Sequence, residues 1–274
     1  MLVPDPISII LVVLVFVPLE RLFALRHEQR ILRNLWQLDT VYLLVNGAII
    51  GFGLNLVLFG ALMLTSQIVP KQFQSWVGAQ PFWLQLPVLL LLSDLGFYTV
   101  HRMFHKVPWL WKFHAVHHSI EEMDWLAAHR VHPLDQILTK GASLLPVVAL
   151  GFSAWPVAAY ATIYHWQSLF IHSNVKINLG PLARIFASPR FHHWHHANHA
   201  EAFDKNFAAQ LSFLDALFGT LHMPTEKMPR RYGTNTPVPQ NYGPQLMFPF
   251  QPEGSEPVQQ AKPQQAVGGS AERA

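Results

Sequence analysis

The chain has 274 residues and no cysteine, and this absence excludes several kinds of site. A disulfide, an iron–sulfur cluster and a thiolate-ligated haem all need cysteine sulfur. A metal bound by this chain must therefore be held by nitrogen and oxygen ligands. The absence does not identify a compartment, because a chain without cysteine folds in either redox environment.

Charged residues are also scarce, at 13% of the chain against 51% hydrophobic residues. That charged share is about half of what a soluble domain usually carries. The formal net charge is only +3 and the basic residues form no dense patch, so no nucleic-acid partner is expected. Nine tryptophans and 19 phenylalanines are instead typical of a protein anchored at a membrane interface.

Four apolar regions predict membrane helices, over residues 6–19, 38–65, 82–100 and 137–171. The first is short for a full span. It predicts a retained helix more than a signal peptide, because Asp5 precedes it and no small-residue cleavage site follows. The fourth is too long for one span and is interrupted at Gly151-Phe-Ser-Ala-Trp-Pro156. That break predicts a hairpin of two apolar helices of about 15 residues each.

The basic residues predict an orientation in the membrane. They follow the first and third apolar regions and flank the hairpin, with Arg130 and Lys140 before it, whereas the opposite loops carry only Lys71. An excess of lysine and arginine marks the cytoplasmic side. We therefore expect the N-terminus outside and the histidine clusters and C-terminal tail in the cytoplasm, whether the hairpin spans or re-enters.

Most of the 16 histidines fall in three tight clusters just outside the apolar regions. Residues three and four apart share one helix face, so each cluster directs two or three imidazoles at one point. Imidazole binds iron, zinc, copper and nickel, and eight converging rings exceed what one tetrahedral zinc can use. The spacing thus indicates two metals at a membrane surface, with a pH-sensing cluster as the alternative. The eight are His101, His105, His114, His117, His118, His192, His195 and His196.

The register of the third cluster has an alternative. His193 and His199 are also available, and His195-His196-Ala-Asn-His199 gives a similar triplet when it is read backwards. We favour His192, His195 and His196 because they repeat the His-x-x-His-His spacing of the second cluster. His193 and His199 are then expected to support the site or lie at the surface.

Ordered motifs surround these clusters. They are Asp94…His101-Arg102…His105, Arg130-Val-His-Pro-Leu-Asp135, Ser188-Pro-Arg-Phe-His-His-Trp-His-His196, Asp204-Lys-Asn-Phe207 and Leu217-Phe-Gly-Thr220. Over approximately residues 85–222, the combination resembles the fatty acid hydroxylase/sterol desaturase superfamily. The resemblance implies an integral-membrane oxygenase whose histidine boxes bind two non-haem irons. It also implies hydroxylation or desaturation of lipid chains or sterols with O₂ and external electrons.

The resemblance also implies one more ligand from the helix that precedes the third cluster. Here His172, in Phe170-Ile-His-Ser-Asn174, occupies that place, and it shares a helix face with His165 and Ser168. Some members of the superfamily carry a further His or Asn ligand four residues earlier, where this chain has Ser168. The tenth ligand is therefore left open between a water, His165 and His132.

Carboxylates form a further set of candidates. Asp94 lies inside the third apolar region, where a charge is costly. It either hydrogen-bonds a histidine from another segment, orienting that ligand, or forms a polar pair between helices. His132 and Asp135 flank Pro133 and either support the site or cap a helix. Asp204, the first residue of its motif, is added as a candidate supporting residue.

The predicted fold is all-α and integral to the membrane. It has about four transmembrane helices, counting the hairpin, and a cytoplasmic helical cap that holds the histidine-rich dimetal site. Residues 1–80 are expected to form N-terminal membrane helices, residues 81–225 the histidine-box catalytic domain with its hairpin, and residues 226–274 a C-terminal extension. From about residue 251 the extension lacks hydrophobic periodicity, which predicts disorder.

The expected function is hydroxylation, or less favoured desaturation, of a fatty acyl or sterol-like C–H bond. The motifs resemble the hydroxylase and sterol-oxidase branch more than the acyl-CoA desaturases. Two iron ions are expected, which zinc can replace in purified protein. The chain has no flavin, nucleotide or haem-attachment motif, so the electrons are expected from a separate ferredoxin, cytochrome or reductase. Beyond the metal ligands, no catalytic side chain is predicted.

Two other classes of protein compete with this interpretation. A zinc-dependent membrane hydrolase would use the metal to activate water, yet the chain has no His-Glu-x-x-His signature. A metal-binding or metal-transport protein should hold its ligands at mid-membrane. The histidine clusters lie at the ends of the apolar regions instead, which favours the oxygenase.

Overall fold

The computed structural model describes residues 6–224 and 227–252, and this part of the chain is helical. It contains no β-strand, only two isolated bridges, which pair Ala24 with Val175 and Ala197 with Tyr232. The prediction of an all-α fold is therefore confirmed for the described residues.

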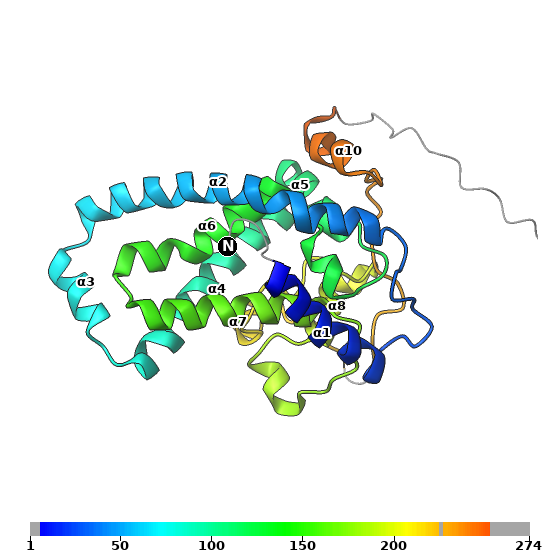
Figure 1. The fold of residues 1–274 in the computed structure, drawn as a ribbon, viewed down its shortest axis with the longest axis horizontal. Helices are drawn as coiled ribbons and strands as arrows, with labels where there is room; N and C mark the ends of the chain where they lie inside the picture. The colour runs from blue at the N-terminus through cyan, green and yellow to red at the C-terminus, as the bar shows by residue number, and fades with distance from the viewer. Residues whose placement is uncertain (1–5, 225–226, 253–274) are drawn as a thin grey trace, which may run out of the picture.

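Five long helices carry the architecture. They are α1 (Pro6–Leu22), α2 (Trp36–Ile68), α4 (Phe82–Lys106), α6 (Pro133–Leu150) and α7 (Ala154–His172). In Figure 1, α2, α4, α6 and α7 run side by side, with α3 (Lys71–Gly78) at one end of the bundle and α8 (Pro189–His195) toward the other. The remaining α-helices are α5 (Pro108–His118), α9 (Phe213–Leu217) and α10 (Tyr242–Met247). Single 3₁₀ turns are η1 (Trp125–His129), η2 (Gly180–Arg184), η3 (Ala200–Ala202) and η4 (Phe248–Phe250).

Two of the described helices, α2 and α4, are long and apolar enough to cross a membrane, with mean hydropathies of 2.1 and 1.4. Large apolar side chains of α2, among them Phe52, Leu56 and Phe59, are exposed to the surroundings of the protein. Such exposure suits contact with lipid, since a soluble protein rarely leaves a large apolar patch open to water. Two of the four predicted spans thus have candidates by length and composition.

The predicted hairpin is present as α6 and α7. Its turn falls at Gly151, which has a φ of +76° and ends α6 in the left-handed conformation that favours glycine. In the middle of α6, a Cβ added to Gly96 of α4 would lie 2.5 Å from the Ala142 carbonyl oxygen. The α4 and α6 backbones are therefore in direct contact, which brings the histidine end of α4 beside the start of α6.

One basic residue lies elsewhere than expected. The sequence placed Lys140 before the hairpin, but the structure places it inside α6. The helix begins at Pro133, because Pro is favoured at a first helical position and His132 caps this end. This lysine therefore does not mark a loop between membrane helices.

The first helix packs onto the rest of the fold. Val12 and Phe16 of α1 contact Leu169 and Ala128, and Phe16 stacks on the Trp166 ring at 6.0 Å. Near the end of α1, the Glu20 carboxyl accepts hydrogen bonds from the backbone N–H groups of Trp125 and Asn174. Trp125 follows the second histidine cluster, and Asn174 lies two residues after His172. The C-terminal end of α1 is thereby fixed beside those segments.

The described part of the C-terminal extension also packs on the bundle. The Tyr42 hydroxyl donates to Gln245 at 2.7 Å, and the Tyr242 hydroxyl donates to Asn46 at 2.8 Å. These contacts join α10 to α2. The predicted disorder from about residue 251 falls almost wholly on residues 253–274, which lie outside the described residues.

Candidate metal centre

Two consecutive helices present the first two histidine clusters. His101 and His105 lie in the last two turns of α4, and Val107 then breaks the helix in an extended conformation. Pro108 starts α5 at a position where its missing N–H costs nothing. The short turn directs the α5 histidines back toward α4.

The remaining candidate ligands come from α7 and α8. His172 is the last residue of α7. The α8 helix begins where the Ser188 hydroxyl accepts from the Phe191 N–H at 3.3 Å, with Pro189 at the first helical position. The capped turn fixes the orientation of the histidines that follow. The segment between α7 and α8 places these histidines beside those of α5.

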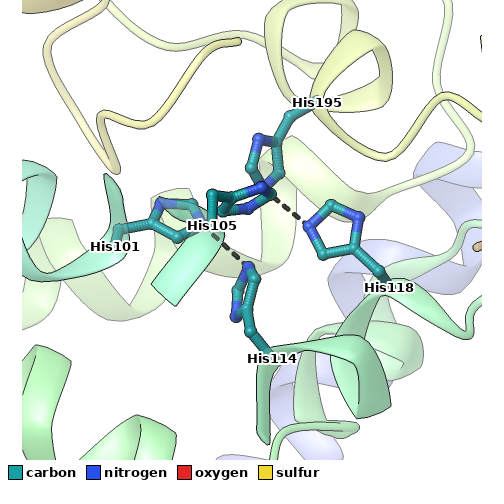
Figure 2. A group of neighbouring side chains, drawn as sticks. All are labelled: His101, His105, His114, His118 and His195. Carbon is teal, nitrogen blue, oxygen red and sulfur yellow. Dashed lines mark hydrogen bonds between the residues drawn. The ribbon is translucent and has the colours of Figure 1, made fainter. Parts of the chain in front are cut away.

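The structure brings the nine predicted ligands together in two groups. Within each group, one nitrogen of every ring lies within 4.8 Å of those of the others. Figure 2 shows the first group, with rings from α4, α5 and α8 directed at a common point. The first group is His101, His105, His114, His118 and His195, and the second is His117, His172, His192 and His196.

The closest contacts within the groups are between ring nitrogens. His101 Nε2 lies 2.9 Å from His114 Nε2, and His118 Nε2 lies 3.0 Å from His195 Nε2. In the second group, His172, His192 and His196 approach one another or His117 at 2.9–3.2 Å through Nε2. A proton can bridge one such pair but not all of them. A cluster of facing lone pairs is therefore a donor set that fits a cation.

In four of the rings, the partner of Nδ1 shows that Nε2 is the nitrogen left free for a metal. Nδ1 lies near the Phe207 carbonyl for His101, the Arg130 carbonyl for His117 and the Lys205 carbonyl for His195, at 2.7–2.9 Å. His172 Nδ1 has the Ser168 carbonyl at 2.7 Å. A carbonyl only accepts, so in each case Nδ1 must donate and the Nε2 lone pair faces the group centre.

Burial keeps these imidazoles neutral. It lowers the pKa of His117 to about 4, and it holds the pKa values of His114, His118, His192, His195 and His196 well below the usual range. Desolvation is the largest cause in every case, because burial penalises the charged imidazolium. Neutral imidazole is the form that binds a metal, so both groups are prepared for one.

Asp135 contacts the first group directly. Its Oδ2 lies 2.6 Å from His114 Nδ1, and both side chains are buried. A carboxylate at this place accepts the Nδ1–H and orients the ring. Of the two alternatives left open for Asp135, the structure therefore supports the one in which it holds a candidate ligand.

A buried ionic network lies behind the second group, and the sequence analysis did not identify it. The Arg130 side chain forms two bonds to Asp39, at 2.5 and 2.9 Å, while its carbonyl accepts from His117. Arg33 bridges Asp39 and Asp124 at 2.5 and 2.7 Å. The network fixes the Arg130 backbone and hence the His117 ring. Its one signal in the sequence was Asp39, a charge just inside the second apolar region.

The prediction that Asp94 hydrogen-bonds a histidine or pairs two helices is wrong. Its carboxylate accepts instead from the backbone N–H groups of Ala209, Gln210 and Leu211, at 2.6–3.1 Å. These three donors replace water around the buried carboxylate. Asp94 therefore holds the loop whose Phe207 carbonyl faces His101.

A second carboxylate, missed in the sequence, supports the same loop from the other side. Asp215 accepts from the Phe207 and Ala208 N–H groups at 2.7 and 2.9 Å and from the Thr220 hydroxyl at 2.6 Å. Thr220 ends the motif Leu217-Phe-Gly-Thr220. That motif thus has a structural role, because it fixes the carboxylate that shapes the loop.

Seven histidines lie outside both groups, and four of them were considered for the site in the sequence analysis. His132 caps α6, accepting at Nδ1 from the Leu134 N–H, and its Nε2 lies 3.1 Å from the Leu246 carbonyl. Both nitrogens of buried His193 are engaged, with the Tyr232 hydroxyl and the Ser173 carbonyl. His165 is exposed on α7, and His199 precedes η3. Neither His132 nor His165 is placed as a tenth ligand.

Asp204 lies at the edge of the first group. Its Oδ1 is 3.7 Å from His105 Nδ1, and its Oδ2 is 2.6 Å from Lys106 Nζ. The nearby His105 imidazole and the hydrogen bond from Lys106 lower the pKa of this half-exposed carboxyl to about 2. A cavity of about 670 Å³ opens here and reaches the first group, with His105, His118 and His195 among its lining residues.

These features define a class of protein: a helical protein with membrane-length helices and two adjacent histidine groups able to hold metals. Residues 86–220 match the family described as Fatty acid hydroxylase, and this range contains all nine candidate ligands. Residues 86–220 thus form a fatty acid hydroxylase domain, as the motifs indicated.

Individual relatives agree with that assignment. The chain is 30% identical to ornithine lipid hydroxylase OlsE of Rhizobium tropici over 193 residues, which are 70% of this chain and 58% of that protein. It is 35% identical over 148 residues to alkylglycerol monooxygenase of Homo sapiens, covering 53% of this chain and 32% of the relative. Methylsterol monooxygenase 1 of Rattus norvegicus is 29% identical over 143 residues, 50% of this chain and 47% of the relative. The chain thus spans less than two thirds of each of these relatives. No solved structure matches it significantly.

Proposed function

We propose that this protein is a membrane-bound oxygenase that hydroxylates a lipid C–H bond with O₂. The observation that carries the proposal is the pair of buried histidine groups at one end of an apolar helical bundle. The three relatives named above are hydroxylases or monooxygenases of lipids or sterols, according to their names. A fatty acyl or sterol-like substrate follows by analogy, with desaturation as the less favoured outcome.

Each histidine group would hold one non-haem iron ion, the first through its five rings and the second through its four. When bound, the metals would supply the oxidant that an unactivated C–H bond requires and that no side chain provides. The chain contributes the rest. Asp135 and the carbonyls of Phe207, Arg130 and Lys205 orient the rings. Zinc can occupy the same donors in purified protein, because nitrogen ligands do not select against it.

A four-span arrangement fits the distribution of exposed tryptophans. Trp76 of α3, Trp83 at the start of α4 and Trp155 at the start of α7 are 60%, 73% and 81% exposed. The hairpin turn at Gly151 lies against Gln74 of α3, so all three belong to the end of the bundle that is far from the histidines. Tryptophan favours the membrane–water interface. We place this end at the outer face, with α2, α4, α6 and α7 crossing the membrane.

The histidine groups then lie at the cytoplasmic face, where the basic residues gather. Because α2 then begins at the cytoplasmic face, an N-terminus outside requires α1 to cross the membrane as a further span, in keeping with the arginines that follow α1. The cavity beside His105 gives the first group a route to this side. An external ferredoxin, cytochrome or reductase would deliver electrons there.

Two rival functions are weaker. A metal transporter needs ligands near mid-membrane, whereas both groups lie at the histidine end of α4 and beyond it. A zinc hydrolase needs one metal site with an open position for water, and nine rings in two adjacent groups exceed that need.

Lipid analysis of cells that express the chain would test the proposal. Lipid extracts of cells with wild-type protein, with His117→Ala or with His101→Ala are compared after incubation in air and without O₂. We expect a lipid that carries one added oxygen atom only with the wild type in air. The same lipid in oxygen-free cells, or at an equal level with both variants, would refute the oxygenase.

A further inference from the structure

Lys140 is an ionisable residue within the apolar hairpin. It lies on α6, eight residues into a helix that ends at Gly151, and its side chain is half-buried. A charged residue in a membrane segment is costly and usually has both a partner and a function. A partner for Lys140 is therefore expected.

No such partner is found among the described residues. Six contacts between a basic side chain and a carboxylate are present in this part of the chain, and none includes Lys140. The Tyr164 ring of α7 faces this lysine, with Lys140 Nζ 5.8 Å from the ring centroid. A cation–π contact at this distance offsets only part of the cost of removing the ammonium from water.

Two further basic side chains lie near the lysine. His129, at the end of η1, has its pKa lowered to about 4 by burial and by the positive charges of His165 and Lys140. Neither His129 nor His165 forms a side-chain hydrogen bond with another described residue. Three nitrogen-bearing side chains from η1, α6 and α7 thus lie close enough for their charges to interact, and the described part of the chain offers them no acceptor.

This cluster lies within a lipid's reach of the second histidine group. His165 is seven residues before His172, so the two share a face of α7 and are about 10 Å apart along its axis. Helical side chains also point toward the helix N-terminus, which directs Lys140 toward the Pro133 end of α6, where Asp135 contacts His114.

We propose that Lys140, with His129 and His165, binds the anionic oxygens of a lipid headgroup, a phosphate or a carboxylate. The ammonium and the imidazole N–H groups are donors, and an anionic oxygen is the acceptor that they lack. The lipid supplies the missing counter-charge and leaves its apolar chain near the second histidine group. An uncharged sterol would leave Lys140 uncompensated. This inference rests on the proposed function only in identifying the lipid as substrate.

Equilibrium binding tests the site without turnover. The purified full-length protein in detergent is titrated with dihexanoyl phosphatidic acid and with dihexanoylglycerol, which lacks the phosphate. Native mass spectrometry reads the bound fraction. We expect the wild type to prefer the phosphate-bearing lipid by about tenfold or more, as one charge-assisted contact allows. Lys140→Met should remove this preference, and Lys140→Arg should keep most of it.

The matched control is Lys71→Met, which makes the same change on α3 at the far end of the bundle. It should bind like the wild type. Lys140→Met should also unfold at the same temperature as the wild type or a higher one, because it removes an uncompensated charge. A lower unfolding temperature would indicate that Lys140 forms a structural ion pair, and would overturn the proposal. The proposal would also be overturned if Lys140→Met kept the preference for the phosphate-bearing lipid, or if the wild type had no such preference.

Inorganic phosphate is the last competitor. If it displaces the lipid at equal concentration, the site binds free phosphate and the lipid assignment is wrong. Because no arm depends on O₂, a failure here leaves the oxygenase proposal standing. A failure of the oxygenase test likewise leaves this binding result intact.

Discussion

At the scale of single residues, the second nitrogen of each imidazole decides how the first is used. Backbone carbonyls fix the Nδ1–H of His101, His117, His172 and His195. His114 differs because its Nδ1 partner is the Asp135 carboxylate. A carboxylate makes the imidazole a stronger donor to a metal than a carbonyl does, so Asp135 should matter for binding as well as for orientation.

Asp135→Asn tests this role. The amide has nearly the same shape but no charge, so we expect metal affinity or lipid oxidation to fall by about 10- to 100-fold. Competition with a metal-binding dye measures the affinity. Asp204→Asn is the comparison, since Asp204 is half-exposed and 3.7 Å from His105, and its effect should be smaller. Equal effects of the two changes would argue against a special role for Asp135.

Metal stoichiometry tests the division of the nine rings. We expect about two metal ions per chain in active protein, one for each group. His117→Ala should remove one ion from the second group, and His105→Ala one from the first, each abolishing lipid oxidation while the helices stay folded. His27→Ala, on an exposed residue, is the control. Elemental analysis that finds one ion or none in active protein would contradict the two-metal assignment.

At the scale of helices, the hydrophobic pattern predicted the long elements well. The four apolar regions appear as α1, α2, α4 and the α6–α7 hairpin, with the turn at Gly151. What the pattern could not give is the amphipathic α3, which has too few residues for a clear period. It also misplaced Lys140, because helix α6 starts at Pro133, directly after the His132 cap and before the apolar run begins.

Close contact of α4 with α6 places His101 and Asp135 near each other, and Gly96 permits that contact. In Gly96→Ala the new Cβ would lie 2.5 Å from the Ala142 carbonyl oxygen, so the helices must separate. We expect a loss of about 1–3 kcal/mol in unfolding free energy, as for overpacked sites, and weaker metal binding. Thermal unfolding in detergent measures the change in stability.

Gly60→Ala is the matched control for this change. Gly60 is also helical, and a Cβ there meets nothing within 4 Å. Alanine should be neutral or stabilise the helix by up to about 1 kcal/mol. If both variants behaved alike, the α4–α6 contact would not determine stability.

At the scale of the whole molecule, the sequence placed the ligands better than their supports. The three histidine clusters and the motif around His172 identified all nine members of the two groups. The partners of Asp94 and the Arg33–Asp39–Arg130 network could not be predicted, because they join segments about 90 to 120 residues apart through backbone groups and loops. Periodicity reports which face is apolar and carries no information about such pairs.

Membrane topology is the first prediction for the molecule as a whole. With the histidine groups at the cytoplasmic face, the segment around α3 must lie outside and residue 251 inside. A cysteine introduced at Gln72 should react with an impermeant thiol reagent in intact cells, whereas a reporter fused after Gln251 should be active only in the cytoplasm. The native chain has no cysteine, so the background is low. A reporter active only outside would contradict the orientation.

Labelling with ¹⁸O₂ tests the central claim most directly. Membranes that contain the wild-type protein, its electron donor and lipid are incubated under ¹⁸O₂ in ordinary water, and the lipid product is analysed by mass spectrometry. Hydroxylation predicts one ¹⁸O atom in the product. A zinc hydrolase would take its oxygen from water, and a desaturase would add none. A lipid product formed at full rate without O₂, or carrying oxygen from water alone, would contradict the account.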